Sequence, residues 1–157
     1  MTPPADVFRT IDDILRYAVG REEDAAALYT QLADRCTKPI MRLTFLEFAA
    51  EERAHRAILE DLLASGRPLL PSEEPVESLG IAPYVPDVKA STDMELREAF
   101  QLAMTEEKKA FLIYWKLAEA ARNRPVLHQT FLGLAQQEAR HKLHFEVEYE
   151  LLTFEEA

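Results

Sequence analysis

The chain of 157 residues contains an internal repeat, and the repeated pattern is helical. Alanine, glutamate, alanine, tyrosine and leucine follow one another at steps of four, three, four and three residues over 18–32, and again over 103–117. The triplet Thr-Phe-Leu then stands at 44–46 and at 130–132, each time eight residues before a glutamate. Steps of three and four residues keep side chains on one face of an α-helix. The sequence therefore predicts two copies of one helical hairpin.

Periodicity and stop signals divide the sequence into four long helices. Pro39 suits the first turn of a helix, and Gly66 followed by Pro68 is a strong stop. Thr92 with Glu95 three residues later forms a capping box, which marks another helix start. We expect helices at about 6–35, 39–65, 92–122 and 125–152.

The segment at about 66–91 separates the two expected hairpins and is rich in proline. Proline removes a backbone donor and clashes inside a helix, so this segment should be extended. Some 25 residues at roughly 3.3 Å each reach about 80 Å, twice the length of a ~40 Å helix. Each hairpin alone would expose a wide apolar face. We therefore predict an all-α, ferritin-like four-helix bundle, with this segment as a long crossover and a single domain over residues 1–157.

The composition restricts the classes of function. The net charge of −10 argues against nucleic-acid binding, which depends on Lys and Arg that neutralise phosphates. The sequence has no run of about 18 apolar residues, so we expect no membrane span. Its N-terminus has neither the basic region nor the apolar core of a secretory signal. A lone cysteine, Cys36, fits a reducing compartment, so we expect a cytoplasmic protein without a cysteine-based metal centre.

Two Glu-x-x-His quartets carry the strongest functional signal. Glu52 precedes His55 by three residues, and Glu138 precedes His141 in the same way at the equivalent place in the repeat. Residues three apart share a helix face and lie about 4.5 Å apart along the axis, so each quartet directs a carboxylate and an imidazole at one point. Two such helices facing two helices with one glutamate each give the pattern of a dinuclear metal site. In the first helix that glutamate is Glu22.

In the third helix two adjacent residues, Glu106 and Glu107, could supply the fourth carboxylate. The repeat favours Glu107, because its separation from Tyr114 equals that of Glu22 from Tyr29. Glu106 stays the alternative, since it also lies on an alanine-lined face. If the first and third helices run antiparallel, each tyrosine can hydrogen-bond the glutamate of the other helix. Ordinary core packing is the other interpretation of both tyrosines.

The chemistry of the donor set indicates which metals to expect. Carboxylate oxygen with imidazole and without thiolate favours iron or manganese over copper(I) or structural zinc. Four carboxylates balance the charge of two divalent ions, whereas without metal they would repel one another. We expect two metal ions, iron first and manganese as a possibility. A metal-free bundle held by salt bridges is the alternative interpretation of the same residues.

At these positions the sequence resembles the rubrerythrin family of the ferritin-like superfamily, over essentially the whole chain. The resemblance rests on four pairs: Glu22 with Tyr29, Glu52 with His55, Glu107 with Tyr114, and Glu138 with His141. It implies a non-haem di-iron centre that, when reduced, reacts with hydrogen peroxide or dioxygen as a peroxidase or ferroxidase. It also implies a homodimer.

Two features of rubrerythrins have no counterpart in this sequence. Full-length members carry a rubredoxin-like domain with four iron-binding cysteines, so we expect a separate electron donor such as a rubredoxin-like protein. Rubrerythrins also use a further glutamate three residues beyond the helix-three ligand. That step leads here to Ala110, or to Lys109 when counted from Glu106. Binding, storage or sensing of iron or manganese without catalytic turnover is therefore the alternative function.

Overall fold

The computed structural model describes residues 10–65 and 95–156, and these residues form four α-helices. The helices are α1 (Ile11–Arg35), α2 (Pro39–Ala64), α3 (Leu96–Ala120) and α4 (Pro125–Glu156). The described part of the chain contains no β-strand, and the predicted all-α class is confirmed.

The start of α1 is set by a capping box that the hydrophobic pattern does not reveal. The helix begins at Ile11, not near residue 6 as predicted, because Thr10 is extended (φ −133°, ψ 162°) and caps it. The Thr10 hydroxyl oxygen accepts from the backbone N–H of Asp13 at 3.1 Å. The Asp13 carboxylate in turn accepts from the backbone N–H of Thr10 at 3.1 Å.

The end of α1 and the starts of α2 and α4 lie where they were predicted, at Arg35, Pro39 and Pro125, and the remaining boundaries differ by a few residues. α3 begins at Leu96 after an extended Glu95 (φ −66°, ψ 152°), so the predicted start at the capping residue Thr92 is wrong. Thr92 itself lies outside the described residues. α3 ends at Ala120, while α4 continues four residues past its predicted end to Glu156.

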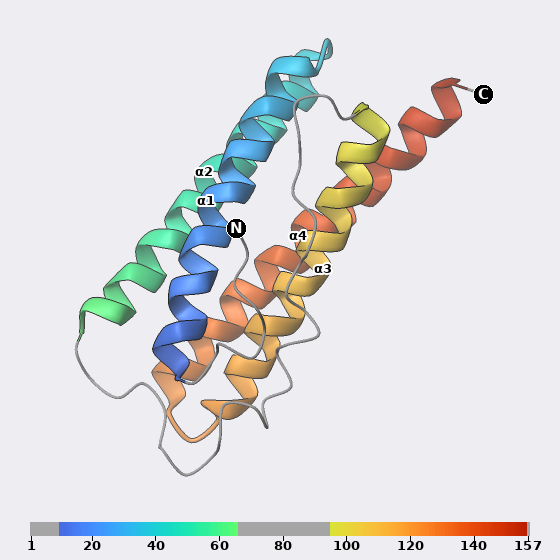
Figure 1. The fold of residues 1–157 in the computed structure, drawn as a ribbon. Helices are drawn as coiled ribbons and strands as arrows, with labels where there is room; N and C mark the ends of the chain where they lie inside the picture. Colours follow the sequence, from blue (N-terminus) through green and yellow to red (C-terminus); the bar gives the residue numbers. More distant parts are fainter. Residues whose placement is uncertain (1–9, 66–94, 157) are drawn as a thin grey trace.

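The helices form two antiparallel hairpins, α1 with α2 and α3 with α4 (Figure 1). In Figure 1, α1 and α4 rise from the lower end of the bundle, while α2 and α3 descend from the upper end. Consequently α1 also runs antiparallel to α3. The end of α2 and the start of α3 lie at opposite ends of the bundle. The predicted crossover at 66–91 lies outside the described residues.

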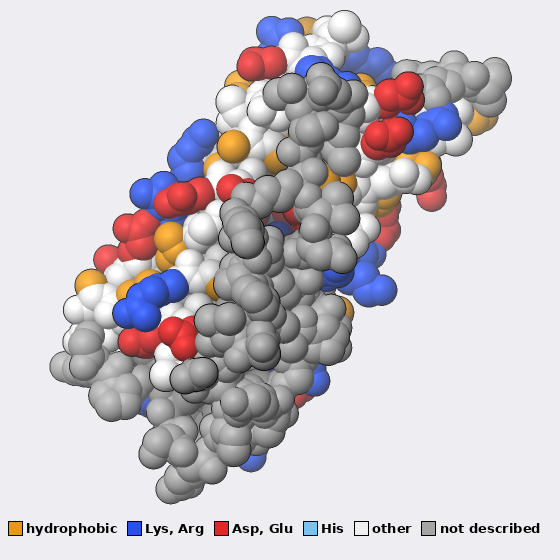
Figure 2. Space-filling model, in the orientation of Figure 1, with side chains coloured by type: hydrophobic (Ala, Val, Ile, Leu, Met, Phe, Trp, Pro, Cys, Tyr) orange, Lys and Arg blue, Asp and Glu red, His pale blue; other side chains and the backbone are white. Residues whose placement is uncertain are grey.

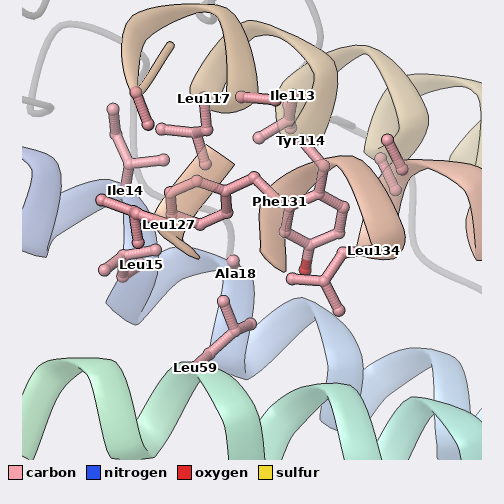
Figure 3. Close-up of a cluster of buried hydrophobic side chains, with 14 residues drawn as sticks. Ile14, Leu15, Ala18, Leu59, Ile113, Tyr114, Leu117, Leu127, Phe131 and Leu134 are labelled. Atoms are coloured by element: carbon pink, nitrogen blue, oxygen red, sulfur yellow. The ribbon is translucent and has the colours of Figure 1, made fainter. Parts of the chain in front are cut away.

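Two clusters of buried apolar side chains fill the interior, one toward each end of the bundle. The first draws side chains from all four helices around Phe131 (Figure 3). The second contains Phe45, the residue equivalent to Phe131 in the sequence repeat, and both rings are fully buried. Ala18 belongs to the first cluster and Ala25 to the second, with Glu22 between them on the same helix. The middle of the bundle is therefore polar, with apolar packing on both sides.

The surface carries charges of both signs. On the face shown in Figure 2, acidic and basic side chains of the described residues lie between single apolar ones. Among the described helices, none is both long enough and apolar enough to cross a membrane. One row of apolar side chains is exposed along α4, at steps of four residues: Leu143 (60%), Val147 (49%) and Leu151 (49%).

Candidate metal centre

Six polar side chains from all four helices meet in the middle of the bundle, and each is at most 2% exposed. They are Glu22 from α1, Glu52 and His55 from α2, Glu107 from α3, and Glu138 and His141 from α4. On α1 and α3 a buried alanine stands about one turn before and after each glutamate. These small side chains leave room for carboxylates between helices that are otherwise packed closely.

Eight atoms of these six residues have no hydrogen-bond partner among the described residues. Both carboxylate oxygens of Glu52 and of Glu138 are open in this sense. Glu22 and Glu107 each leave one oxygen open, Oε2. Each imidazole leaves Nδ1 without a hydrogen bond, although it lies close to a carboxylate oxygen, at 2.8 Å for His55 and Glu138 and at 2.9 Å for His141 and Glu52. A buried polar atom without a partner costs about 1–3 kcal/mol. So many of them at one place indicate a cluster built to hold a bound group.

The open atoms fall into two groups that share two glutamates. In the first group, ligand atoms within 4.8 Å of one another come from Glu22, Glu52, His55 and Glu138. In the second group they come from Glu52, Glu107, Glu138 and His141. Glu52 and Glu138 belong to both groups and have both oxygens open, as a carboxylate that bridges two ions requires. Glu22 and Glu107 belong to one group each and offer one open oxygen. The donor set therefore fits a pair of metal ions.

Tyrosines from the opposite helix hold the other oxygens of the two outer glutamates. Tyr114 on α3 donates its hydroxyl to Glu22 Oε1 on α1 at 2.5 Å. Tyr29 on α1 donates its hydroxyl to Glu107 Oε1 on α3. The antiparallel course of α1 and α3 makes this exchange possible. It leaves Oε2 of each glutamate as the oxygen that faces the cluster.

The outer nitrogen of each imidazole is held by a residue of the other hairpin. His55 Nε2 forms a hydrogen bond with Gln137 Oε1, and His141 Nε2 forms one with Glu51 Oε2. Because both partners are oxygen acceptors, Nε2 carries a proton in each ring, and Nδ1 is the nitrogen that faces the cluster and can bind a metal once it has lost its own proton.

The two partners of the imidazoles differ in charge although they occupy equivalent places in the repeat. Glu51 stands directly before Glu52, and Gln137 stands directly before Glu138. The Glu51 carboxylate also accepts from Arg140 Nη2 at 2.6 Å. One imidazole is thus supported by a carboxylate and the other by a neutral amide.

A buried guanidinium lies beside the carboxylates. Arg21 is 7% exposed, with Nη1 at 3.7 Å from Glu22 Oε1 and Nη2 at 3.9 Å from Glu138 Oε2. Nη2 donates to the backbone carbonyl oxygen of Glu106 at 3.1 Å. Nε and Nη1 have no hydrogen-bond acceptor within the described residues. The cluster therefore contains a fixed positive charge that contributes no ligand atom.

Burial and mutual repulsion change the proton affinities of the cluster. Burial, together with the negative charge of Glu138, raises the pKa of Glu52 and of Glu107 well above its usual value. Burial opposes ionisation of Glu138 as well, but contacts with Glu107 and His55 and the nearby guanidinium lower its pKa. Burial would lower the pKa of His55, but contacts with two carboxylates outweigh it and raise that pKa to about 10. Without metal, the cluster thus holds protons that a cation would displace.

The structure brings together all six residues that the spacing singled out. Glu107 is in the cluster, while its neighbour Glu106 lies outside both groups. The sequence reasoning missed Arg21, Glu51 and Gln137. The repeat could have pointed to the last two, because they precede the two quartets at equivalent places. No pattern marks Arg21, whose equivalent in the repeat is Glu106.

A cluster of carboxylates and imidazoles shared by four helices defines a class of ferritin-like proteins with a site for two metal ions. The chain matches the family model described as Rubrerythrin over residues 13–149, and it belongs to the rubrerythrin family. A solved structure of a hypothetical protein from Pyrococcus furiosus shares the fold, with a TM-score of 0.73, 22% sequence identity and 96% of each chain covered. A search among curated proteins finds no match.

Proposed function

We propose that this chain is a di-iron carboxylate protein that reduces hydrogen peroxide or dioxygen. The observation that carries the proposal is the set of eight open atoms, divided into two groups with two shared glutamates. When bound, a pair of iron ions supplies two electrons to an O–O bond. Manganese suits the same ligands.

In this proposal, buried side chains hold the metal pair in fixed positions and away from bulk water. Glu52 and Glu138 would contribute ligands to both ions, Glu22 with His55 would hold one of them, and Glu107 with His141 would hold the other. Tyr29 and Tyr114 orient the terminal carboxylates by donating to their outer oxygens. Burial raises the pKa of Tyr114 well above its ordinary value, so its hydroxyl keeps its proton and remains a donor. The apolar clusters on both sides exclude bulk water.

We also propose an electron donor, a location in the cell and an oligomeric state for this protein. Cys36 is the sole cysteine in the sequence and is buried, so we propose that electrons come from a separate protein such as a rubredoxin-like donor. We propose a cytoplasmic homodimer whose residues 1–157 fold as one domain. The exposed apolar row on α4 at Leu143, Val147 and Leu151 supports an interface between copies.

Anaerobic loading with ferrous iron, followed by peroxide or dioxygen, tests the proposal. We expect about two irons per chain and a fast rise in near-ultraviolet absorbance on oxidation. Glu52→Ala should abolish iron binding, whereas Glu47→Ala, an exposed change on the same helix, should preserve it. Fewer than about one iron per chain, unchanged in Glu52→Ala, would contradict the proposal.

The same preparation separates catalysis from storage. Repeated peroxide consumption with added rubredoxin and a reductant would establish an enzyme. Oxidation that stops after one equivalent per site, with the iron retained, would favour iron binding or storage without turnover.

A further inference from the structure

Arg21 adds a positive charge that the metal pair does not need. Four carboxylates balance two divalent ions, so the proposed loaded centre is neutral without it. With Arg21, which is 7% exposed and beside Glu22 and Glu138, the centre carries one net positive charge. We infer that the Arg21 side of the cluster is a binding site for a small monoanion. This inference rests on the proposed function, because it assumes that the metal pair is bound.

The hydrogen bonds of Arg21 support an anion site. Of the donor atoms in its guanidinium, Nη2 donates to the backbone carbonyl of Glu106, while Nε and Nη1 have no acceptor in the described residues. The contacts of 3.7 Å with Glu22 and 3.9 Å with Glu138 are ion pairs too long to be hydrogen bonds. Those carboxylates are also the ones that metal ions would engage. A buried charge with open donors is costly unless an anion pairs with it.

The other acidic groups nearby are poor counter-ions for Arg21. Glu106 offers Arg21 its backbone carbonyl oxygen, and its carboxylate forms no ion pair with Arg21 within the described residues. The charge of Asp24 lies near enough to raise the pKa of Tyr17, but Asp24 forms no ion pair with Arg21 within the described residues. The open donors Nε and Nη1 are therefore available to an external anion. Azide and the hydroperoxide anion are small monoanions that can accept a charge-assisted hydrogen bond from one of these N–H groups.

Azide binding to cobalt-loaded protein tests the inference without any redox reaction. Protein holding two Co²⁺ per chain is titrated with sodium azide while the visible absorption of cobalt is recorded. We expect saturable binding to the wild-type protein and about tenfold or more weaker binding to Arg21→Met. Arg21→Lys keeps the charge but replaces the planar guanidinium donors, so its azide affinity should fall between those of the wild type and Arg21→Met. Arg53→Met removes the same charge from the exposed side of α2 and should leave the azide affinity unchanged.

Several outcomes would overturn the inference. The inference is wrong if azide does not bind to the wild-type protein. It is also wrong if wild-type and Arg21→Met protein, each holding two cobalt ions, bind azide with equal affinity. If Arg21→Met does not retain its metal, the test uses Arg21→Lys. An azide affinity of Arg21→Lys equal to that of the wild type then contradicts the inference. If the wild-type protein itself binds no cobalt pair, the proposed function fails, which is distinguishable from failure of the anion site alone.

Discussion

The two histidines of the cluster have similar neighbours at Nδ1 and different neighbours at Nε2. His141 donates from Nε2 to the Glu51 carboxylate, whereas His55 donates to the amide oxygen of Gln137. A carboxylate behind an imidazole increases its basicity as a metal ligand more than an amide does. The two metal positions should therefore differ in affinity, with the position at His141 the stronger.

Glu51→Gln should remove this difference by weakening one of two metal-binding steps. We expect a loss of about 10- to 100-fold in affinity at that step, measured by calorimetric titration with Co²⁺. Gln137→Glu is the matched change on the other hairpin and should strengthen the weaker step. Two binding steps that stay the same in Glu51→Gln would contradict a role for this carboxylate.

The metal-free protein should lose stability as the pH rises. The pKa of His55 is raised from 6.5 to about 10, so its contribution is complete below pH 6.5 and is lost as the pH approaches 10. The raised pKa values of Glu52 and Glu107 act in the same direction. Thermal unfolding of chelator-treated protein between pH 6.5 and about 10 should show a falling Tm.

A matched pair of variants checks the source of that pH dependence. His55→Gln should flatten the slope of Tm against pH, because it removes the group that titrates. His144→Gln changes a histidine of α4 that lies outside the cluster and should keep the wild-type slope. A Tm that rises with pH in the metal-free protein would contradict the assignment.

The six cluster residues could be predicted from sequence because the helical repeat fixes which positions share a face. Arg21 could not be predicted, since the side chains of neighbouring residues on a helix point about 100° apart and either one can lie next to the helix interface. The same ambiguity affected Glu106 and Glu107. Packing of α1 against α3 decides it, placing Glu107 in the cluster and only the backbone carbonyl of Glu106 against Arg21.

At the scale of the helices, each second helix of a hairpin anchors one core cluster through a phenylalanine. Phe45 of α2 and Phe131 of α4 are fully buried, toward opposite ends of the bundle. Phe45 packs face to face on Phe145 with ring centroids 5.4 Å apart. The polar middle of the bundle therefore depends on two separate apolar clusters that pack on either side of it.

Phe45→Ala and Phe131→Ala should each lower the free energy of unfolding by about 3–5 kcal/mol, because each leaves a cavity in a packed cluster. Urea denaturation of the two variants is the measurement. Leu43→Ala, at a position 61% exposed on α2, should change the free energy by less than about 0.5 kcal/mol. A loss below about 1 kcal/mol in both phenylalanine variants would contradict this view of the core.

Helix identity was predictable from periodicity, and the starts of α2 and α4 from Pro39 and Pro125, while the starts of α1 and α3 were not. Apolar spacing continues across a potential start whether or not the backbone is capped there. Thr10 with Asp13 and Thr92 with Glu95 offer the same kind of capping sequence. The structure uses the first and begins α3 after Glu95, without a side-chain cap hydrogen bond at that residue.

At the scale of the whole molecule, the exposed row on α4 favours association of two copies. Leu143, Val147 and Leu151 lie one turn apart, so they form a continuous apolar strip. Val147→Glu should convert a dimer to a monomer in sedimentation or light scattering, because it places a charge in the middle of that strip. Glu150→Gln, on an exposed part of the same helix, serves as the control. A wild-type protein that is monomeric at high concentration would contradict the proposed homodimer.

We propose that this bundle holds two metal ions in one cluster with two shared glutamates. Anomalous diffraction from crystals of iron-loaded protein can locate these ions. We expect two anomalous peaks midway along the bundle, one beside His55 and one beside His141, both in contact with Glu52 and Glu138. A single peak, or peaks away from these four residues, would contradict it.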